Sequence, residues 1–175
     1  MAREYYVLED MAIREAAKPL ISVAIHPGGY YMAASFIDKI RIHHILHDEF
    51  KHYKNIEIKN CKVMKFSQGG HLFACVSDNS INFFNSYTLE IVKIVPLGSV
   101  LGNGEVTFLQ FNEKDSAIAV CADNGYVGRW LLPSYECIQE SIPDPGSTYL
   151  SLDFHHSENE KDHNTLVLAG SVTDP

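Results

Sequence analysis

A repeated pattern of short strands is the feature that most restricts how this chain folds. Its best copy runs from Cys61 to Asn85, where apolar stretches alternate with turns at Gly69-Gly70 and Asp78-Asn79. Glycine takes positive φ angles without steric cost, so the first pair predicts a tight turn. The run from His71 to Val76 is almost continuously apolar, as expected of a strand that is buried on both faces.

Further copies of the pattern recur along the chain at a nearly constant period. The equivalent positions at the end of the first strand are separated by 41, 45 and 43 residues, and they are Ile25, Phe66, Phe111 and Phe154. Four strands per unit at roughly 40–45 residues is typical of a WD-repeat propeller blade. We therefore predict an all-β fold, a WD-repeat β-propeller fragment with about three complete four-stranded blades and partial blades at both ends.

The repeat also predicts where the blades begin and end. We expect blades at residues 21–58, 61–100 and 105–142, and a partial blade at 147–175. Residues 1–20 form either a short helix or the last two strands of a preceding blade, and the spacing favours the strands. Because both ends then carry half blades, we expect self-association through open sheet edges. A ring of four blades closed within one chain is the alternative.

Composition narrows the function classes. The chain has 175 residues, of which 46% are hydrophobic, and this suits a globular domain with a core. It contains no apolar run long enough to cross a membrane and no signal peptide, so we expect a cytoplasmic protein without a membrane partner. A net charge of −8 argues against nucleic acid as a partner. The four cysteines show no Cys-x-x-Cys spacing, which predicts buried free thiols.

Catalytic and metal-binding patterns are weak in this sequence. Four histidines fall within ten residues, but they leave a strand and enter a loop, so neighbouring side chains point apart; they are His43, His44, His47 and His52. No nucleophile elbow, P-loop or dinucleotide fingerprint is found in the sequence. We therefore expect no enzymatic activity, no metal site and no cofactor.

One part of the chain resembles a known family. The segments Gly69–Ala74, Asp38–Arg41 and Asp48–Phe50 lie within His26–Asn85, a stretch similar to the WD-repeat region of the cilia- and flagella-associated proteins, most closely the member numbered fifty-seven. The resemblance implies a non-enzymatic scaffold of the ciliary and flagellar axoneme, which helps to position inner-arm dynein and regulatory complexes on doublet microtubules. It implies tubulin or dynein subunits as partners. The alternative is a generic cytosolic WD-repeat adaptor, such as a ubiquitin-ligase substrate receptor or a signalling scaffold.

The chain departs from the general WD pattern at two points. Trp130 is followed by Leu131 instead of aspartate, and no histidine occurs between Ser86 and Phe154. The buried Asp-His-Ser-Trp hydrogen-bond network of regular WD blades is therefore not expected here.

Positive charge is concentrated in one segment. Residues 39–65 carry seven of the fourteen lysines and arginines against three acidic residues, a net charge of +4, while the rest of the chain has −12. The segment is either solvated surface or an edge that binds an acidic partner. This candidate partner-binding basic edge consists of Lys39, Arg41, Lys51, Lys54, Lys59, Lys62 and Lys65, of which Lys51, Lys54 and Lys59 belong to the predicted edge strand.

Overall fold

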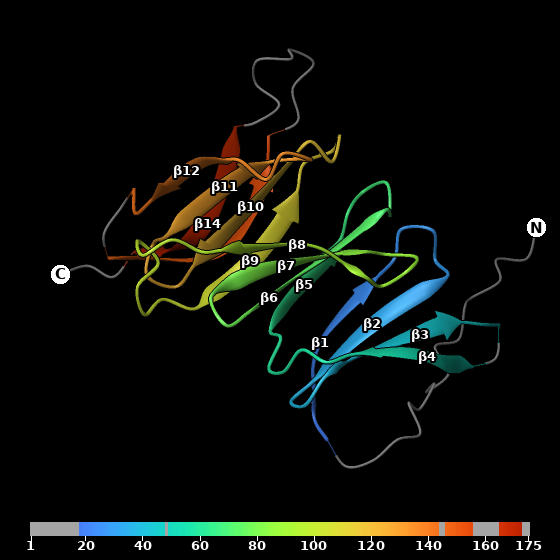
Figure 1. Ribbon diagram of the computed structural model, residues 1–175. Helices are drawn as coiled ribbons and strands as arrows, with labels where there is room; N and C mark the ends of the chain where they lie inside the picture. Colours follow the sequence, from blue (N-terminus) through green and yellow to red (C-terminus); the bar gives the residue numbers. More distant parts are fainter. Residues whose placement is uncertain (1–17, 48, 144–145, 156–164, 173–175) are drawn as a thin grey trace, which may run out of the picture.

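The structure, a computed structural model, describes residues 18–47, 49–143, 146–155 and 165–172. These residues form fourteen β-strands and no α-helix (Figure 1). The described part of the chain therefore contains no helix that could span a membrane. The short helix or the two strands of a preceding blade expected within residues 1–20 fall almost entirely on residues 1–17, which lie outside the described residues.

The first two sheets each have four antiparallel strands in sequence order. Their turns hold the residues that tolerate positive φ, with Gly29 at 73° and Gly70 at 76°. The first sheet contains β1 (Leu20–Ile25), β2 (Tyr31–Phe36), β3 (Ile40–Ile45) and β4 (Phe50–Ile56). The second contains β5 (Val63–Phe66), β6 (Leu72–Ser77), β7 (Ser80–Asn85) and β8 (Ile91–Pro96).

The third sheet repeats the same order, and a two-stranded sheet follows it. The third sheet contains β9 (Val106–Phe111), β10 (Ala117–Ala122), β11 (Val127–Leu131) and β12 (Cys137–Ser141). The last sheet pairs β13 (Ser147–Phe154) with β14 (Leu166–Val172). Three four-stranded sheets with a partial one after them confirm the predicted fold class, an all-β fragment like part of a propeller.

The sheets follow one another as blades do, each packing against the next. The first strands β1, β5, β9 and β13 contact one another in turn, and Figure 1 shows the sheets arranged in chain order from blue to red. Apolar side chains fill the space between neighbouring sheets. Ile42 and Phe84 belong to the cluster between the first and second sheets, and Phe83 and Trp130 to the cluster between the second and third. The second and third strands of these sheets are therefore the most buried, whereas the first strand β1 is mostly exposed and the fourth strands lie on the outside.

Two side-chain links join the turns of neighbouring sheets. His26 Nδ1 accepts a hydrogen bond from the backbone, so its Nε2 carries the proton and donates to Gly70 O at 2.8 Å. The Asp115 carboxylate accepts the backbone N–H groups of Gln68-Gly69 at 2.8 and 2.6 Å. The first link joins the first and second sheets, and the second link joins the second and third. Hydrogen bonds between turns thus connect neighbouring blades. They do so in a chain whose sequence lacks residues of the Asp-His-Ser-Trp hydrogen-bond network of regular WD blades.

The four cysteines differ in their exposure. Cys61, Cys75 and Cys121 are buried free thiols, as predicted. Cys137 is also a free thiol but is exposed, so the prediction of burial is wrong for this residue. It begins β12, an outer strand that no further sheet covers among the described residues.

Candidate protein-interaction surface

The seven basic residues of segment 39–65 are divided among several positions of the fold. Two lie on the outer strand β4, and the others lie in turns, in a link between sheets, or on strands closer to the centre. Lys39 lies between β2 and β3, Arg41 on β3, Lys51 and Lys54 on β4, Lys59 and Lys62 between β4 and β5, and Lys65 on β5.

Lys62 and Lys65 are engaged at the inner strands. Lys62 Nζ lies 2.5 Å from the Glu105 carboxylate. The Lys65 ammonium donates to the Gln110 side chain on β9 and lies 5.1 Å from the centre of the Phe108 ring. Burial lowers the pKa of Lys65, although the nearby carboxylate of Asp153 acts in the opposite direction. Both lysines therefore form contacts between neighbouring sheets rather than an outer edge.

Arg41 and Lys59 also differ from the expectation for an edge strand. Arg41 is only 8% exposed, because its guanidinium lies 4.7 Å from the centre of the Phe36 ring. Lys59 was expected in the edge strand, but β4 ends at Ile56, so Lys59 is an exposed residue of the link to the second sheet. Neither residue presents its charge on β4.

Lys51 and Lys54 are exposed on β4 and share one face of the first sheet. Lys51 is paired with His44 and Lys54 with Ile42, two residues apart on β3, so both lysines lie on the same side. The register shifts between these pairs, which leaves Tyr53 as an extra residue in β4, a β-bulge. Lys54 Nζ donates to the backbone carbonyl of Thr88 at 3.2 Å. Since Thr88 lies in the turn between β7 and β8 of the second sheet, this face of β4 is turned toward that sheet.

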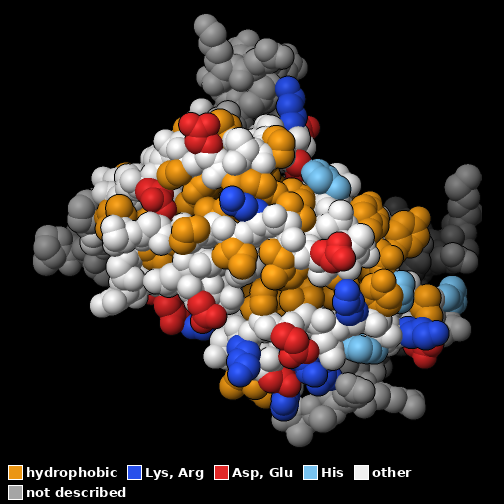
Figure 2. Space-filling view, in the orientation of Figure 1, with side chains coloured by type: hydrophobic (Ala, Val, Ile, Leu, Met, Phe, Trp, Pro, Cys, Tyr) orange, Lys and Arg blue, Asp and Glu red, His pale blue; other side chains and the backbone are white. Residues whose placement is uncertain are grey.

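Aromatic rings continue from this face of β4 to the second sheet. His44 lies 4.7 Å from Tyr53 and 5.0 Å from Tyr31, measured between ring centroids. His26 then lies 5.8 Å from Tyr31 and 5.9 Å from Tyr87, which follows β7. We call these five residues, Tyr53, His44, Tyr31, His26 and Tyr87, the aromatic strip. Figure 2 shows histidine, lysine and hydrophobic side chains side by side where β2, β3 and β4 lie in Figure 1.

The histidine-rich segment forms ring contacts instead of a cluster of metal ligands. The His43 and His52 rings lie edge to face at 5.7 Å, and His44 contacts the tyrosines of the aromatic strip. His52 Nε2 is also within hydrogen-bond distance, 2.9 Å, of Asn55 Oδ1. Across the ranges that the structure describes, no group of three or more metal-binding side chains comes together.

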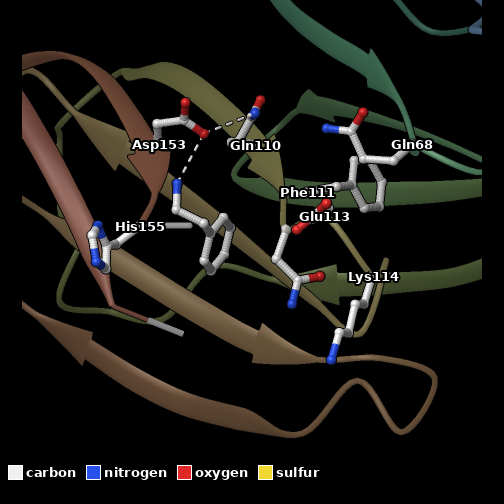
Figure 3. A pocket seen from close by; sticks show the side chains of 9 residues that line it. Gln68, Gln110, Phe111, Glu113, Lys114, Asp153 and His155 are labelled. Carbon is white, nitrogen blue, oxygen red and sulfur yellow. Dashed lines mark hydrogen bonds between the residues drawn. The ribbon is translucent and has the colours of Figure 1, made fainter. Parts of the chain in front are cut away.

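A polar hollow of about 290 Å³ lies between β9 and β13 (Figure 3). Asp153 Oδ1 accepts hydrogen bonds from Gln110 Nε2 at 3.1 Å and from the backbone N–H of Phe154 at 2.9 Å. Figure 3 shows the Lys114 side chain directed away from this carboxylate. The hydrogen bonds hold Asp153 against the backbone and an amide, an arrangement that stabilises the contact between two inner strands. It does not pair a nucleophile with a base.

Sequence reasoning missed the residues that make this surface distinctive. The bulge places Tyr53 on the same face of the sheet as Lys54. No residue pattern in the sequence of β4 predicts this bulge. Tyr31 and Tyr87 are 56 residues apart in the sequence and become part of one strip only through the packing of two sheets. The repeat itself was the available signal, because it places Tyr31 at the start of a second strand and Tyr87 in a turn.

Comparisons with known proteins point to one group of relatives. No family model matches the chain. The chain is 32% identical over 132 residues to cilia- and flagella-associated protein 57 of Mus musculus, an alignment that covers 73% of this chain and 10% of the relative. It is 30% identical over 118 residues to cilia- and flagella-associated protein 57 A of Tetrahymena thermophila, covering 67% of this chain and 9% of that protein.

A third relative agrees with these two. Cilia- and flagella-associated protein 57 C of Tetrahymena thermophila is 32% identical over 122 residues, which cover 63% of this chain and 9% of that protein. The matched region thus spans about a tenth of the length of the curated relatives.

Proposed function

We propose, from the homology of this chain with a segment of cilia- and flagella-associated protein 57, that it is part of a protein-interaction scaffold of the axoneme in cilia and flagella. Three four-stranded sheets that pack side by side support this role, because such blades present edges and turns to partners. The proposed role is non-enzymatic. In its finer form, the scaffold helps to position inner-arm dynein and regulatory complexes on doublet microtubules, with tubulin or dynein subunits as partners.

The observation that carries the proposal is the exposed lysine pair on β4. Lys51 and Lys54 lie on one face of an outer strand, in a chain with a net charge of −8. A local positive surface on an acidic protein favours an acidic partner and steers its approach. The proposed partner-binding edge is therefore reduced to these two lysines of β4, together with the exposed Lys59 in the link that follows β4.

Self-association between copies is a second proposed property. The outer strand β14 pairs only with β13 among the described strands, so its other edge offers free backbone groups. Sedimentation velocity over a range of protein concentrations tests this property, and a monomer at every concentration would contradict it.

Retention of the chain in detergent-extracted cilia tests the proposed role. The chain, carrying a fluorescent tag, is expressed in a ciliated cell, and the cilia are then stripped of membrane. We expect the tagged chain to remain along the axoneme, whereas the tag alone leaves with the detergent. A chain that stays in the cell body, or that detergent removes from the cilium, would favour the cytosolic adaptor instead.

A further inference from the structure

We propose that the aromatic strip binds an extended proline-rich segment of a partner protein, with acidic residues beside the prolines. This inference deepens the function proposed above and rests on it, since it names the chemistry of the acidic partner that faces β4.

The rings at the two ends of the strip are accessible. Tyr53 is 46% exposed and Tyr87 is 54% exposed, while His26 between them is buried and holds the strip against the two sheets. Rings of tyrosine offer a large apolar surface with a hydroxyl at its rim, which is the reason tyrosine is frequent in interfaces. The successive ring contacts make the strip one connected set of rings, whose accessible parts lie on either side of the buried His26.

The bulge disfavours addition of a partner strand along β4. A regular ladder needs an uninterrupted alternation of backbone groups, and the extra residue Tyr53 breaks this alternation in the middle of β4. The bulge also turns the Tyr53 ring onto the face that carries Lys54. Recognition at this surface therefore relies on side chains, not on backbone pairing.

An extended proline-rich segment fits a surface of this kind. Its polyproline II conformation has no internal hydrogen bonds, so its carbonyl groups are free to accept from tyrosine hydroxyls. Proline rings pack on aromatic side chains, and the conformation loses little entropy on binding because it is already formed. Lys51 and Lys54 flank the Tyr53 end of the strip and complement acidic residues beside the prolines.

Binding of defined peptides to the full chain tests the inference. The probe is the labelled peptide Glu-Glu-Pro-Pro-Leu-Pro-Pro-Glu-Glu, followed by fluorescence anisotropy. We expect saturable binding that weakens about tenfold or more in the double variant Tyr53→Ser, Tyr87→Ser, because central tyrosines dominate such contacts. The variant Tyr30→Ser is the matched control, since Tyr30 is 69% exposed and is not a member of the strip. Tyr53→Phe keeps the ring and should retain most of the binding.

Two comparison peptides and one hydrodynamic measurement separate the alternatives. A peptide with Gly and Ser in place of the prolines keeps the charge, and equal binding of this peptide would overturn the role of the strip. Absence of peptide binding to the native chain would overturn the inference as well. Loss of self-association in the tyrosine double variant would also overturn it, because that result would identify a second copy of the chain as the occupant of the strip. These results leave the axonemal role untouched, because retention in cilia is measured without the peptides. Circular dichroism melting of each variant confirms that the fold is intact.

Discussion

Individual buried side chains hold neighbouring sheets together, and Tyr126 is the clearest case. Its ring is fully buried in the cluster between the second and third sheets, and its hydroxyl donates to Glu140 Oε1 at 2.8 Å. The same oxygen accepts the backbone N–H of Gly98 at 2.8 Å, which ties the segment after β8 to β12. Burial, and then the nearby Glu140 carboxylate, raise the pKa of Tyr126 well above its ordinary value.

This shift predicts a loss of stability at high pH that depends on Tyr126. The folded chain keeps the phenol proton, while the unfolded chain releases it above about pH 10, so the free energy of unfolding falls as the pH rises beyond that value. Below about pH 10 the contribution of this group is complete. We expect Tyr126→Phe to destabilise the fold by about 1–3 kcal/mol at neutral pH, because a hydrogen bond to a charged group is lost.

Urea unfolding from neutral pH to above pH 10 measures this effect. The difference in the free energy of unfolding between the native chain and Tyr126→Phe should shrink as the pH passes about 10. The other tyrosines are present in both proteins and serve as the internal control. Parallel decline of the two curves would show that Tyr126 does not titrate differently on folding.

At the scale of the elements, the turns between first and second strands carry the contacts that join blades. Gly70 adopts a φ of 76°, and a Cβ placed there would lie 2.5 Å from His26 Nε2. Gly29 occupies the equivalent region of the first sheet with a φ of 73°, but a Cβ there would meet no atom within 4 Å. The two glycines thus share a backbone conformation and differ in their surroundings.

We expect Gly70→Ala to destabilise the chain more than Gly29→Ala. Both substitutions place alanine at positive φ, which costs roughly 1–2 kcal/mol. Only the first also displaces the His26 ring, with a further loss of about 1 kcal/mol from its hydrogen bond to Gly70 O. Thermal and urea unfolding of both variants measure the difference, and equal destabilisation would mean that the His26 link adds nothing to stability.

The elements also show what could be predicted from the sequence. Gly69-Gly70 and Asp78-Asn79 identified turns that the structure contains between β5, β6 and β7, because these residues tolerate positive φ. The repeat period likewise predicted four-stranded sheets. The bulge at Tyr53 was not predictable, since it depends on how β3 and β4 pair and not on a residue type within β4.

The directions in which the basic side chains point could not be predicted from the sequence. Segment 39–65 is basic as a block, yet Arg41 turns onto the Phe36 ring and Lys65 contacts Gln110 of the next inner strand. The period of the repeat indicates which residues form strands. It does not indicate which neighbouring sheet packs against each face of a strand. Of the seven residues of the expected basic edge, only Lys51 and Lys54 therefore lie on the outer strand β4.

At the scale of the whole molecule, three findings belong together. The described strands form packed four-stranded sheets, the resemblance seen in the sequence is confirmed by relatives named cilia- and flagella-associated protein 57, and lysines are exposed on the outer strand β4. We propose that this strand contacts an acidic axonemal surface. Such a contact depends on charge and must weaken as salt shortens the Debye length, from about 10 Å at 0.1 M to about 3 Å at 1 M.

Co-sedimentation with purified microtubules tests this proposed contact, using two double variants of equal charge. Lys51→Glu with Lys54→Glu, and Lys93→Glu with Lys114→Glu, each change the net charge from −8 to −12, and all four lysines are exposed. We predict that the native chain and the Lys93, Lys114 variant bind in a salt-sensitive manner, and that the Lys51, Lys54 variant binds about tenfold more weakly. Equal binding by the two variants, or binding that is indifferent to salt, would contradict the claim.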